Sequence, residues 1–474
     1  MGAGGSSPHL LPAMAHDPLP RPAATPLWRP QPARAGTLSL RAGALWALGG
    51  SAASAGGQWL FIVLLAKLTR PEEVGHYALA LALTAPAVML LNLQLRALIA
   101  SDATGAFRFA DYLSLRLFTT LLGLAGSLVV AGLLGYRGAV FALIAAVALG
   151  KALDAVADVL AGAQQQHERL DRVSTSALLK ALLGLLGAAA VLRGGGGAAA
   201  AGAAMAGLNA LVLLLYDLPM AARVLEGAGA LRPRLRWGVL RQLAVLALPL
   251  GVVMLLVSLI ANVPRYFIEH RWGATELGVY SALAYVLTAG MLAVSAAGQA
   301  ATPRLARAYA QGRRDLFVPL CGWLMAVALA MGVGGVAAAA LFGRELLTLL
   351  YTPTYAARQH TFVLVMVGAA VSFLAGALGS IVTAARVLRA QVPLCLAVLA
   401  VTTLASAAWV PGRGADGAAL ATLCGFLVQL GGFALLYRRA LAGLARSSRG
   451  TTEEGGPGAG GFPPRRRTPP RGLA

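Results

Sequence analysis

Three charged residues lie at helical spacing inside an apolar stretch of the chain. Lys151, Asp154 and Asp158 fall within about 60° of one another when they are placed on an α-helix at about 100° per residue. Charges inside a membrane helix are costly and usually serve a function. We therefore expect Lys151 to face a polar cavity that binds substrate, and Asp154 and Asp158 to be candidates for binding a coupling ion. The alternative is a structural ion pair between Lys151 and Asp154, with Asp158 at the cytoplasmic edge of the membrane.

Three further cations are candidates for binding an anion in the same cavity. Arg96, Lys180 and Arg265 each lie within an apolar stretch or at its end. A guanidinium group binds phosphate through two parallel hydrogen bonds, so the arginines in particular suit an anionic lipid headgroup. In the alternative, each side chain extends to the membrane interface and only anchors its helix.

The sequence contains no catalytic or metal-binding pattern. The three cysteines lie in apolar runs without paired spacing, and no histidine has a second ligand three or four residues away. There is no Ser–His–Asp pattern and no glycine-rich phosphate loop between a strand and a helix. We expect no cofactor, no metal site and no enzymatic activity.

The amino-acid composition indicates the kind of environment in which these charged residues lie. Of the 474 residues, 58% are hydrophobic and only 12% are charged, whereas soluble proteins have about 45–50% and about 25%. Too few polar side chains remain to cover a water-facing surface, which excludes a soluble enzyme. The net charge of +21 is then interpreted as a topology signal, because Lys and Arg concentrate in cytoplasmic loops, and not as a sign of nucleic-acid binding.

About twelve stretches are long and apolar enough to cross a membrane as helices of roughly 20 residues. They predict an all-α polytopic membrane protein, and the distribution of Lys and Arg places both termini in the cytoplasm. Within 176–216, Arg193 and the glycines at 194–197 indicate either a turn between two spans or one broken helix. The predicted parts are a disordered N-tail, an N-lobe, a cytoplasmic linker, a C-lobe and a basic disordered C-tail, at 1–41, 42–216, 217–239, 240–438 and 439–474.

A short internal repeat suggests how the spans are arranged. Residues 73–80 read EVGHYALA and residues 276–283 read ELGVYSAL, with Glu, Gly and Tyr at the same spacing. The two copies are six predicted spans apart and begin an even-numbered helix in each half. They predict two six-helix lobes related by a parallel pseudo-two-fold axis, as in some transporters. The alternative is ordinary capping chemistry at two unrelated helix starts.

Four segments resemble a known family. NVPRYFIEHRWGATELGVYSALAYVL at 262–287 and KALDAVADVLAGAQQQHERLD at 151–171 are similar to bacterial polysaccharide biosynthesis proteins of the O-antigen flippase type. LLAKLTRPEEVGHYALALALTAP at 64–86 and LLTLLYTPTYA at 346–356 resemble loops of the same proteins. These proteins belong to the multidrug/oligosaccharidyl-lipid/polysaccharide exporter superfamily.

The resemblance implies a V-shaped transporter of the bacterial inner membrane, active in lipopolysaccharide or other cell-surface polysaccharide assembly. Its substrate would be an undecaprenyl-diphosphate-linked oligosaccharide, moved from the inner to the outer leaflet. Cationic cavity residues would attract the diphosphate. Glycosyltransferases and a polysaccharide polymerase would be its partners in the pathway.

Three other functions remain open from the sequence, one of which is a membrane scaffold that transports nothing. A cation-coupled drug exporter of the same superfamily would need a carboxylate in the membrane, for which Asp154 and Asp158 are the candidates. A membrane glycosyl polymerase or ligase would need a sizeable external loop with acidic, Arg or His residues, and the predicted external loops are short.

Overall fold

The computed structural model describes residues 40–102, 105–225, 227–387 and 390–453, all in helices and short connections. Most of the predicted N-tail and residues 454–474 of the predicted C-tail lie outside these ranges. The helices of the first half are α1 (Leu40–Leu68), α2 (Pro71–Asn92), α3 (Leu95–Ser101), α4 (Phe109–Leu133), α5 (Gly138–Gln166), α6 (Leu170–Arg193), α7 (Ala198–Val212), the π-helical turn η1 (Leu213–Asp217) and α8 (Leu218–Val224). After the short 3₁₀ turn η2 (Ala228–Leu231) come α9 (Trp237–Ala310), α10 (Arg314–Leu350), α11 (Pro353–Ala356), α12 (Gln359–Ala384) and α13 (Gln391–Glu453).

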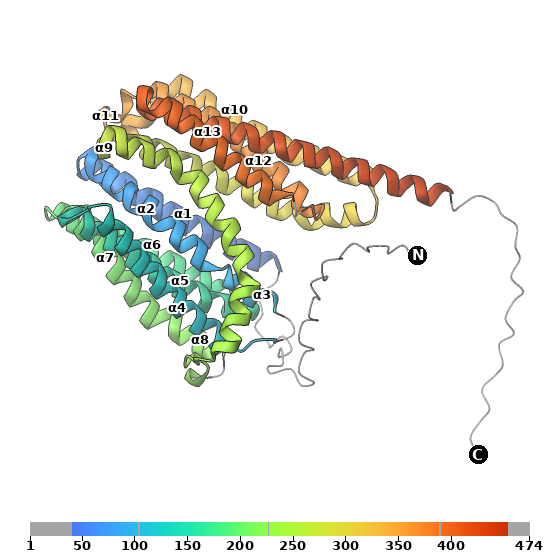
Figure 1. The fold of residues 1–474 in the computed structure, drawn as a ribbon, viewed down its shortest axis with the longest axis horizontal. Coiled ribbons are helices and arrows are strands. Elements are labelled where there is room, and N and C mark those ends of the chain that lie inside the picture. The colour runs from blue at the N-terminus through green and yellow to red at the C-terminus, as the bar shows by residue number, and fades with distance from the viewer. Residues whose placement is uncertain (1–39, 103–104, 226, 388–389, 454–474) are drawn as a thin grey trace, which may run out of the picture.

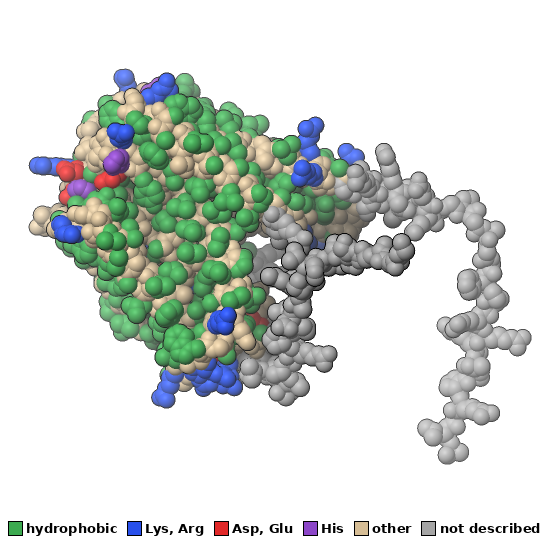
Figure 2. All heavy atoms as spheres, viewed as in Figure 1, with side chains coloured by type: hydrophobic (Ala, Val, Ile, Leu, Met, Phe, Trp, Pro, Cys, Tyr) green, Lys and Arg blue, Asp and Glu red, His purple; other side chains and the backbone are tan. Residues whose placement is uncertain are grey.

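Ten helices in the described ranges are long and apolar enough to cross a membrane. Large hydrophobic side chains such as Leu133, Leu341 and Leu404 are exposed on their outer faces. Figure 2 shows hydrophobic side chains covering the middle of the visible face, with Lys and Arg gathered towards its ends. This distribution is that of a multi-pass membrane protein.

Helices α9, α10 and α13 each contain a break, which lies at Phe342 in α10, and in α9 and α13 the break separates two long arms. The 74 residues of α9 would extend about 110 Å as one helix at about 1.5 Å per residue, but the helix is broken at Gly273, which has φ 77°. In α13 the break is at Gly414, with φ 55°. The two arms of α13 then pack side by side, because Gly425 lies against Thr402 and Gly432 against Leu394.

The helices form two groups. Figure 1 shows α1–α8 as one bundle and α10, α12 and α13 as part of a second, which converge near the labels of α2 and α9 and splay apart away from them. Among the described residues, α9 makes all the substantial contacts between the groups, mainly with α2. Its first arm follows α2, since Gly251 lies against Leu90 and the Tyr266 hydroxyl bonds to the carbonyl of Ala82.

The segment at 176–216 contains a turn between two spans. Helix α6 ends at Arg193, the glycines at 194–197 reverse the chain, and α7 begins at Ala198. The alternative of one broken helix is therefore wrong. Residues 217–224, at the start of the predicted linker, are helical in η1 and α8. Helix α13 continues past residue 438, the predicted end of the C-lobe, to Glu453.

Candidate functional site

A cavity of about 360 Å³ lies within the first bundle, between α1, α2–α3, α5, α6 and α7. Its charged lining residues come from helices that are far apart in sequence. They are Arg96, Lys151, Asp154, Asp158, Lys180 and Asp217. Every site residue predicted in the N-lobe therefore lines one cavity, at the depth of the membrane-spanning helices.

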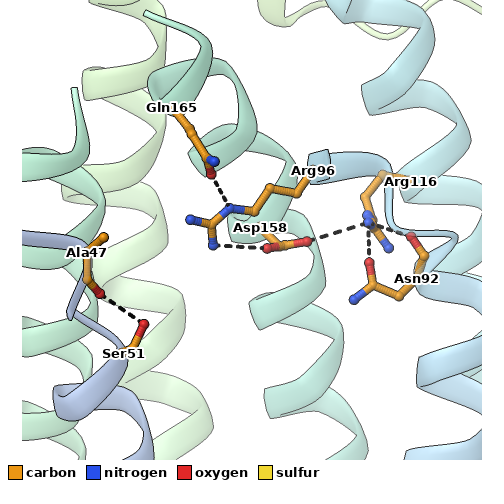
Figure 3. A network of polar contacts seen from close by, with 7 residues as sticks. All are labelled: Ala47, Ser51, Asn92, Arg96, Arg116, Asp158 and Gln165. Carbon is orange, nitrogen blue, oxygen red and sulfur yellow. Dashed lines mark hydrogen bonds and ion pairs between the residues drawn. The ribbon is translucent and has the colours of Figure 1, made fainter. Parts of the chain in front are cut away.

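Asp158, on the wall of this cavity, lies between two arginines, of which Arg96 also lines the cavity and Arg116 is buried behind it (Figure 3). Arg96 Nη1 lies 3.4 Å from Asp158 Oδ1, and Arg96 Nε donates to Gln165 Oε1 at 3.0 Å. On the other side, Arg116 Nη2 lies 3.8 Å from Asp158 Oδ2. Asp158 therefore offsets part of the charge of both guanidinium groups and fixes their positions relative to α5.

Arg116 was not among the predicted site residues. Its side chain is only 1% exposed, and its Nη2 donates to the backbone oxygen of Asn92 at 2.9 Å and to the Asn92 side-chain oxygen at 2.7 Å. Asn92 is the last residue of α2. Because the carbonyl groups at a helix end lack partners within the helix, Arg116 supplies a donor where α2 stops.

The chain between α2 and α3 is strained at this point. Leu93 has φ 52° and Gln94 has φ 50°, a left-handed conformation that costs about 1–3 kcal/mol for a residue other than glycine. The two residues redirect the chain so that Arg96, near the start of α3, reaches the cavity wall. The hydrogen bonds from Arg116 to Asn92 hold the break in place.

Lys180 is neutralised by a carboxylate that the sequence analysis assigned to the linker. Its Nζ lies 2.8 Å from Asp217 Oδ2, and the two side chains are only 16% and 5% exposed. Asp217 belongs to the π-helical turn η1, which continues α7. The pair can position α6 against η1. Because Asp217 compensates the charge of Lys180, the pair as a whole has no net charge with which to attract an anion.

Lys151 has no ion pair and no hydrogen bond among the described residues. The predicted alternative, a Lys151–Asp154 ion pair, is not formed. Asp154 instead accepts a long hydrogen bond, 3.5 Å, from Asn209 Nδ2 on α7. In this cavity Lys151 therefore presents an uncompensated positive charge, and Asp154 presents a carboxylate without a cationic partner.

Arg265 lies outside this cavity, on the first arm of α9. Its Nη1 donates to Asn262 Oδ1 at 2.8 Å, and its guanidinium carbon lies 5.8 Å from the centre of the Tyr285 ring. The Tyr285 hydroxyl in turn accepts a hydrogen bond from Gln58, which lines the cavity. Arg265 is thus linked to the cavity through two side chains, and its Nε is buried without a partner.

The charges of this region favour binding of an anion. Arg96, Lys151 and Lys180 line the cavity together with three carboxylates, and two further cations lie beside it: the buried Arg116 behind Asp158, and Arg265. Inside a membrane such charges attract an anion far more strongly than at a water-exposed surface. Among the described residues, no three His, Cys, Asp or Glu side chains converge as metal ligands would.

Comparisons with known proteins agree with this description. A model of the family described as polysaccharide biosynthesis protein matches residues 40–309. The chain is 23% identical over 387 residues to the capsular polysaccharide biosynthesis protein CapF of Staphylococcus aureus, which covers 81% of this chain and 95% of that protein.

Two solved structures show the fold. The lipid II flippase MurJ, in an inward closed conformation, superposes with a TM-score of 0.65 at 10% identity, over 84% of this chain and 91% of that one. An inward-facing multidrug resistance MATE family transporter gives a TM-score of 0.61 at 14% identity, over 87% and 97% of the two chains. This chain therefore shares the arrangement of helices of these two proteins.

Proposed function

Because the chain belongs to the polysaccharide biosynthesis protein family, we propose that it is a flippase for a lipid-diphosphate-linked oligosaccharide in the inner membrane of a bacterium. The observation that carries this proposal is a cavity within the helix bundle that is lined by three cations, one of which, Lys151, has no ion pair among the described residues. A diphosphate supplies the complementary charge. In this role Lys151 binds the diphosphate directly, Arg96 joins it by exchanging Asp158 for a phosphate oxygen, and Arg265 adds a positive charge beside the cavity.

The architecture that we propose has twelve spans in two six-helix lobes, with both termini in the cytoplasm. The breaks at Gly273 and Gly414 divide α9 and α13 into two spans each. The internal repeat supports a pseudo-two-fold axis through equivalent contacts: Glu73 accepts a hydrogen bond from the backbone N–H of Ala198, at the start of α7, and Glu276 accepts one from Ala415, just after the break in α13. Each glutamate therefore holds the start of the last span of its own lobe.

The membrane potential can drive transport in this mechanism. With the cell interior negative, outward movement of two negative charges is favoured by about 4.6 kcal/mol per 100 mV. When the cavity is empty, the positive charges of Arg116 and Arg265 beside it favour the return of the binding residues towards the inside. No coupling ion is then required.

The cation-coupled exporter is the second candidate, and Asp154 is the observation in its favour. This carboxylate lines the cavity with Asn209 as its hydrogen-bond partner and without a cation beside it. Such a group can take up a proton or a sodium ion. Substitution of Asp154 by Asn would abolish ion-coupled export, whereas potential-driven flipping would persist because Lys151 and Arg265 remain.

Reconstitution of the full-length protein in proteoliposomes tests the proposal. The lipid-diphosphate oligosaccharide is loaded in the inner leaflet, and an impermeant glycosidase reports sugar that reaches the outside. We expect protein-dependent exposure that is accelerated by an inside-negative potential. Absence of exposure with folded protein and several native glycans would contradict the flippase proposal.

Lys151 variants connect this activity to the cavity. Lys151→Gln is expected to lower the flipping rate at least tenfold, because it removes the uncompensated charge, and Lys151→Arg is expected to restore most of it. Arg344→Gln is the matched control, since Arg344 is exposed on α10 and does not line the cavity. Equal rates for Lys151→Gln and Arg344→Gln would remove Lys151 from the proposed substrate site.

A further inference from the structure

A second, smaller cavity lies between α2, α4 and α5, beside the one described above. Its volume is about 20 Å³, which is room for one water-sized sphere. The polar residues that line it include Asn92 of α2, Arg116, Thr119 and Thr120 of α4, and Lys151 of α5. Lys151 is the only charged residue that lines both cavities.

This small cavity is bordered by hydrogen-bond donors that lack acceptors. Arg116 Nε and the Thr120 hydroxyl are buried without a partner, and they lie one helical turn apart on the same face of α4. Lys151 also has no partner among the described residues. Arginine and lysine can only donate hydrogen bonds, and an unmade bond at a buried donor is costly. A ligand of this cavity must therefore be an acceptor.

The charge around the cavity adds a second requirement. Two of its lining residues are cations and none is a carboxylate. Asp158 approaches Arg116 from another side, at Nη2, and is shared with Arg96. Lys151 and Arg116 thus both line this small space, and no carboxylate among the described residues lines it with them.

We propose that the small cavity binds one monovalent inorganic anion of the size of chloride. The anion accepts hydrogen bonds from Arg116 Nε, the Thr120 hydroxyl and Lys151. Its negative charge offsets the positive charge of Arg116 and Lys151. Phosphate or diphosphate is too large for the space, so this site lies beside the proposed site for the lipid substrate and shares only Lys151 with it among the charged lining residues. It goes beyond the proposed function, and its test requires no transport.

Thermal unfolding of the purified full-length protein tests the site. Unfolding is followed by tryptophan fluorescence in sodium chloride and in sodium gluconate at equal ionic strength, since gluconate is too large to enter. We expect saturable stabilisation by chloride alone, with the folding equilibrium shifted about elevenfold when chloride exceeds its Kd tenfold. Equal stabilisation by both salts would overturn the proposal, as would no stabilisation by either, which is the result for a cavity that holds water.

Two matched substitutions locate the effect. Thr120→Val removes the hydroxyl at nearly constant shape, and Thr402→Val makes the same change at a buried threonine hydroxyl on α13 that also lacks a partner. We expect the chloride dependence to weaken severalfold in Thr120→Val, to disappear in Lys151→Met and to remain in Thr402→Val. Chloride dependence that is unchanged in both Thr120→Val and Lys151→Met would place the anion elsewhere and refute this site.

Discussion

Arg116 is the buried charge on which the geometry of the larger cavity depends. It bonds to both oxygens of Asn92 and lies close to Asp158, so it ties the end of α2 to α5 (Figure 3). Removal of one partner of a buried charge pair typically costs about 3–5 kcal/mol, because the remaining charge is left without compensation. A lysine keeps the charge but cannot reproduce the fork of the guanidinium group.

We therefore expect Arg116→Gln to lower the thermal stability of the purified protein strongly, and Arg116→Lys to recover only part of the loss. The measurement is the unfolding temperature in detergent at one salt concentration. Arg193→Gln serves as the control, since Arg193 is exposed at the end of α6. Equal unfolding temperatures for Arg116→Gln and Arg193→Gln would show that the buried contacts contribute little.

At the residue scale, the sequence predicted which side chains share a face but not which partners they have. Helical periodicity places Lys151, Asp154 and Asp158 together because all three belong to α5. Their partners come from other helices: Asn209 from α7 and Arg116 from α4. Arg116 lies two turns into α4, and nothing in its local sequence distinguishes it from the other Lys and Arg residues that were interpreted as topology signals.

At the scale of elements, the hairpin of α13 depends on a close backbone contact. A Cβ at Gly417 would lie 2.4 Å from the backbone oxygen of Trp409, whereas a Cβ at Gly412 in the same turn would have no atom within 4 Å. A backbone oxygen cannot move aside as the end of a flexible side chain can. Overpacking of this kind costs about 1–3 kcal/mol.

Gly417→Ala should accordingly destabilise the protein by about 1–3 kcal/mol, while Gly412→Ala should change its stability little. Both variants are compared by yield of monodisperse protein and by thermal unfolding. Identical behaviour of the two would mean that the chain around Trp409 adapts without cost, and that the turn does not require a glycine at 417.

The sequence predicted the elements better where they are separated by turn residues than where the chain bends inside an apolar run. The glycines at 194–197 do form the turn between α6 and α7. In contrast, the break between α2 and α3 occurs at Leu93 and Gln94, two residues without turn propensity. Contacts from Arg116 stabilise that break, and such long-range contacts leave no local signal in the sequence.

At the scale of the whole molecule, the two helix bundles meet at the internal repeat. Gly75 of α2 lies against the backbone of Ala274, and Gly278 of α9 lies against the backbone of Pro71 and Gly75. Around them, the buried side chains of Ala78, Leu79, Leu277 and Tyr280 form one cluster. The repeat therefore marks the place where the bundles touch, and the bundles splay apart away from it (Figure 1).

Gly278→Ala is expected to open this contact. A Cβ at Gly278 would lie 2.1 Å from the backbone oxygen of Pro71, so the described conformation would be destabilised by about 1–3 kcal/mol. A conformation in which the bundles separate at this end escapes that cost. Its population relative to the described conformation should rise about 5- to 150-fold, because the equilibrium between the two follows their free-energy difference. Spin labels at positions 193 and 344, at this end of the two bundles, would report the change as a longer distance in a cysteine-free background.

Gly334→Ala is the control for this measurement, because a Cβ at Gly334 on α10 would have no atom within 4 Å. Gly75→Ala should act in the same direction as Gly278→Ala, since its Cβ would lie 1.7 Å from the backbone oxygen of Ala274. If both variants fold and keep the label distance of the control, the glycine contact does not hold the bundles together. If both variants lengthen the label distance, the glycines of the repeat are required for the close contact between α2 and α9. Only glycines allow these two helices to approach closely enough to hold the bundles together at one end while they splay apart at the other.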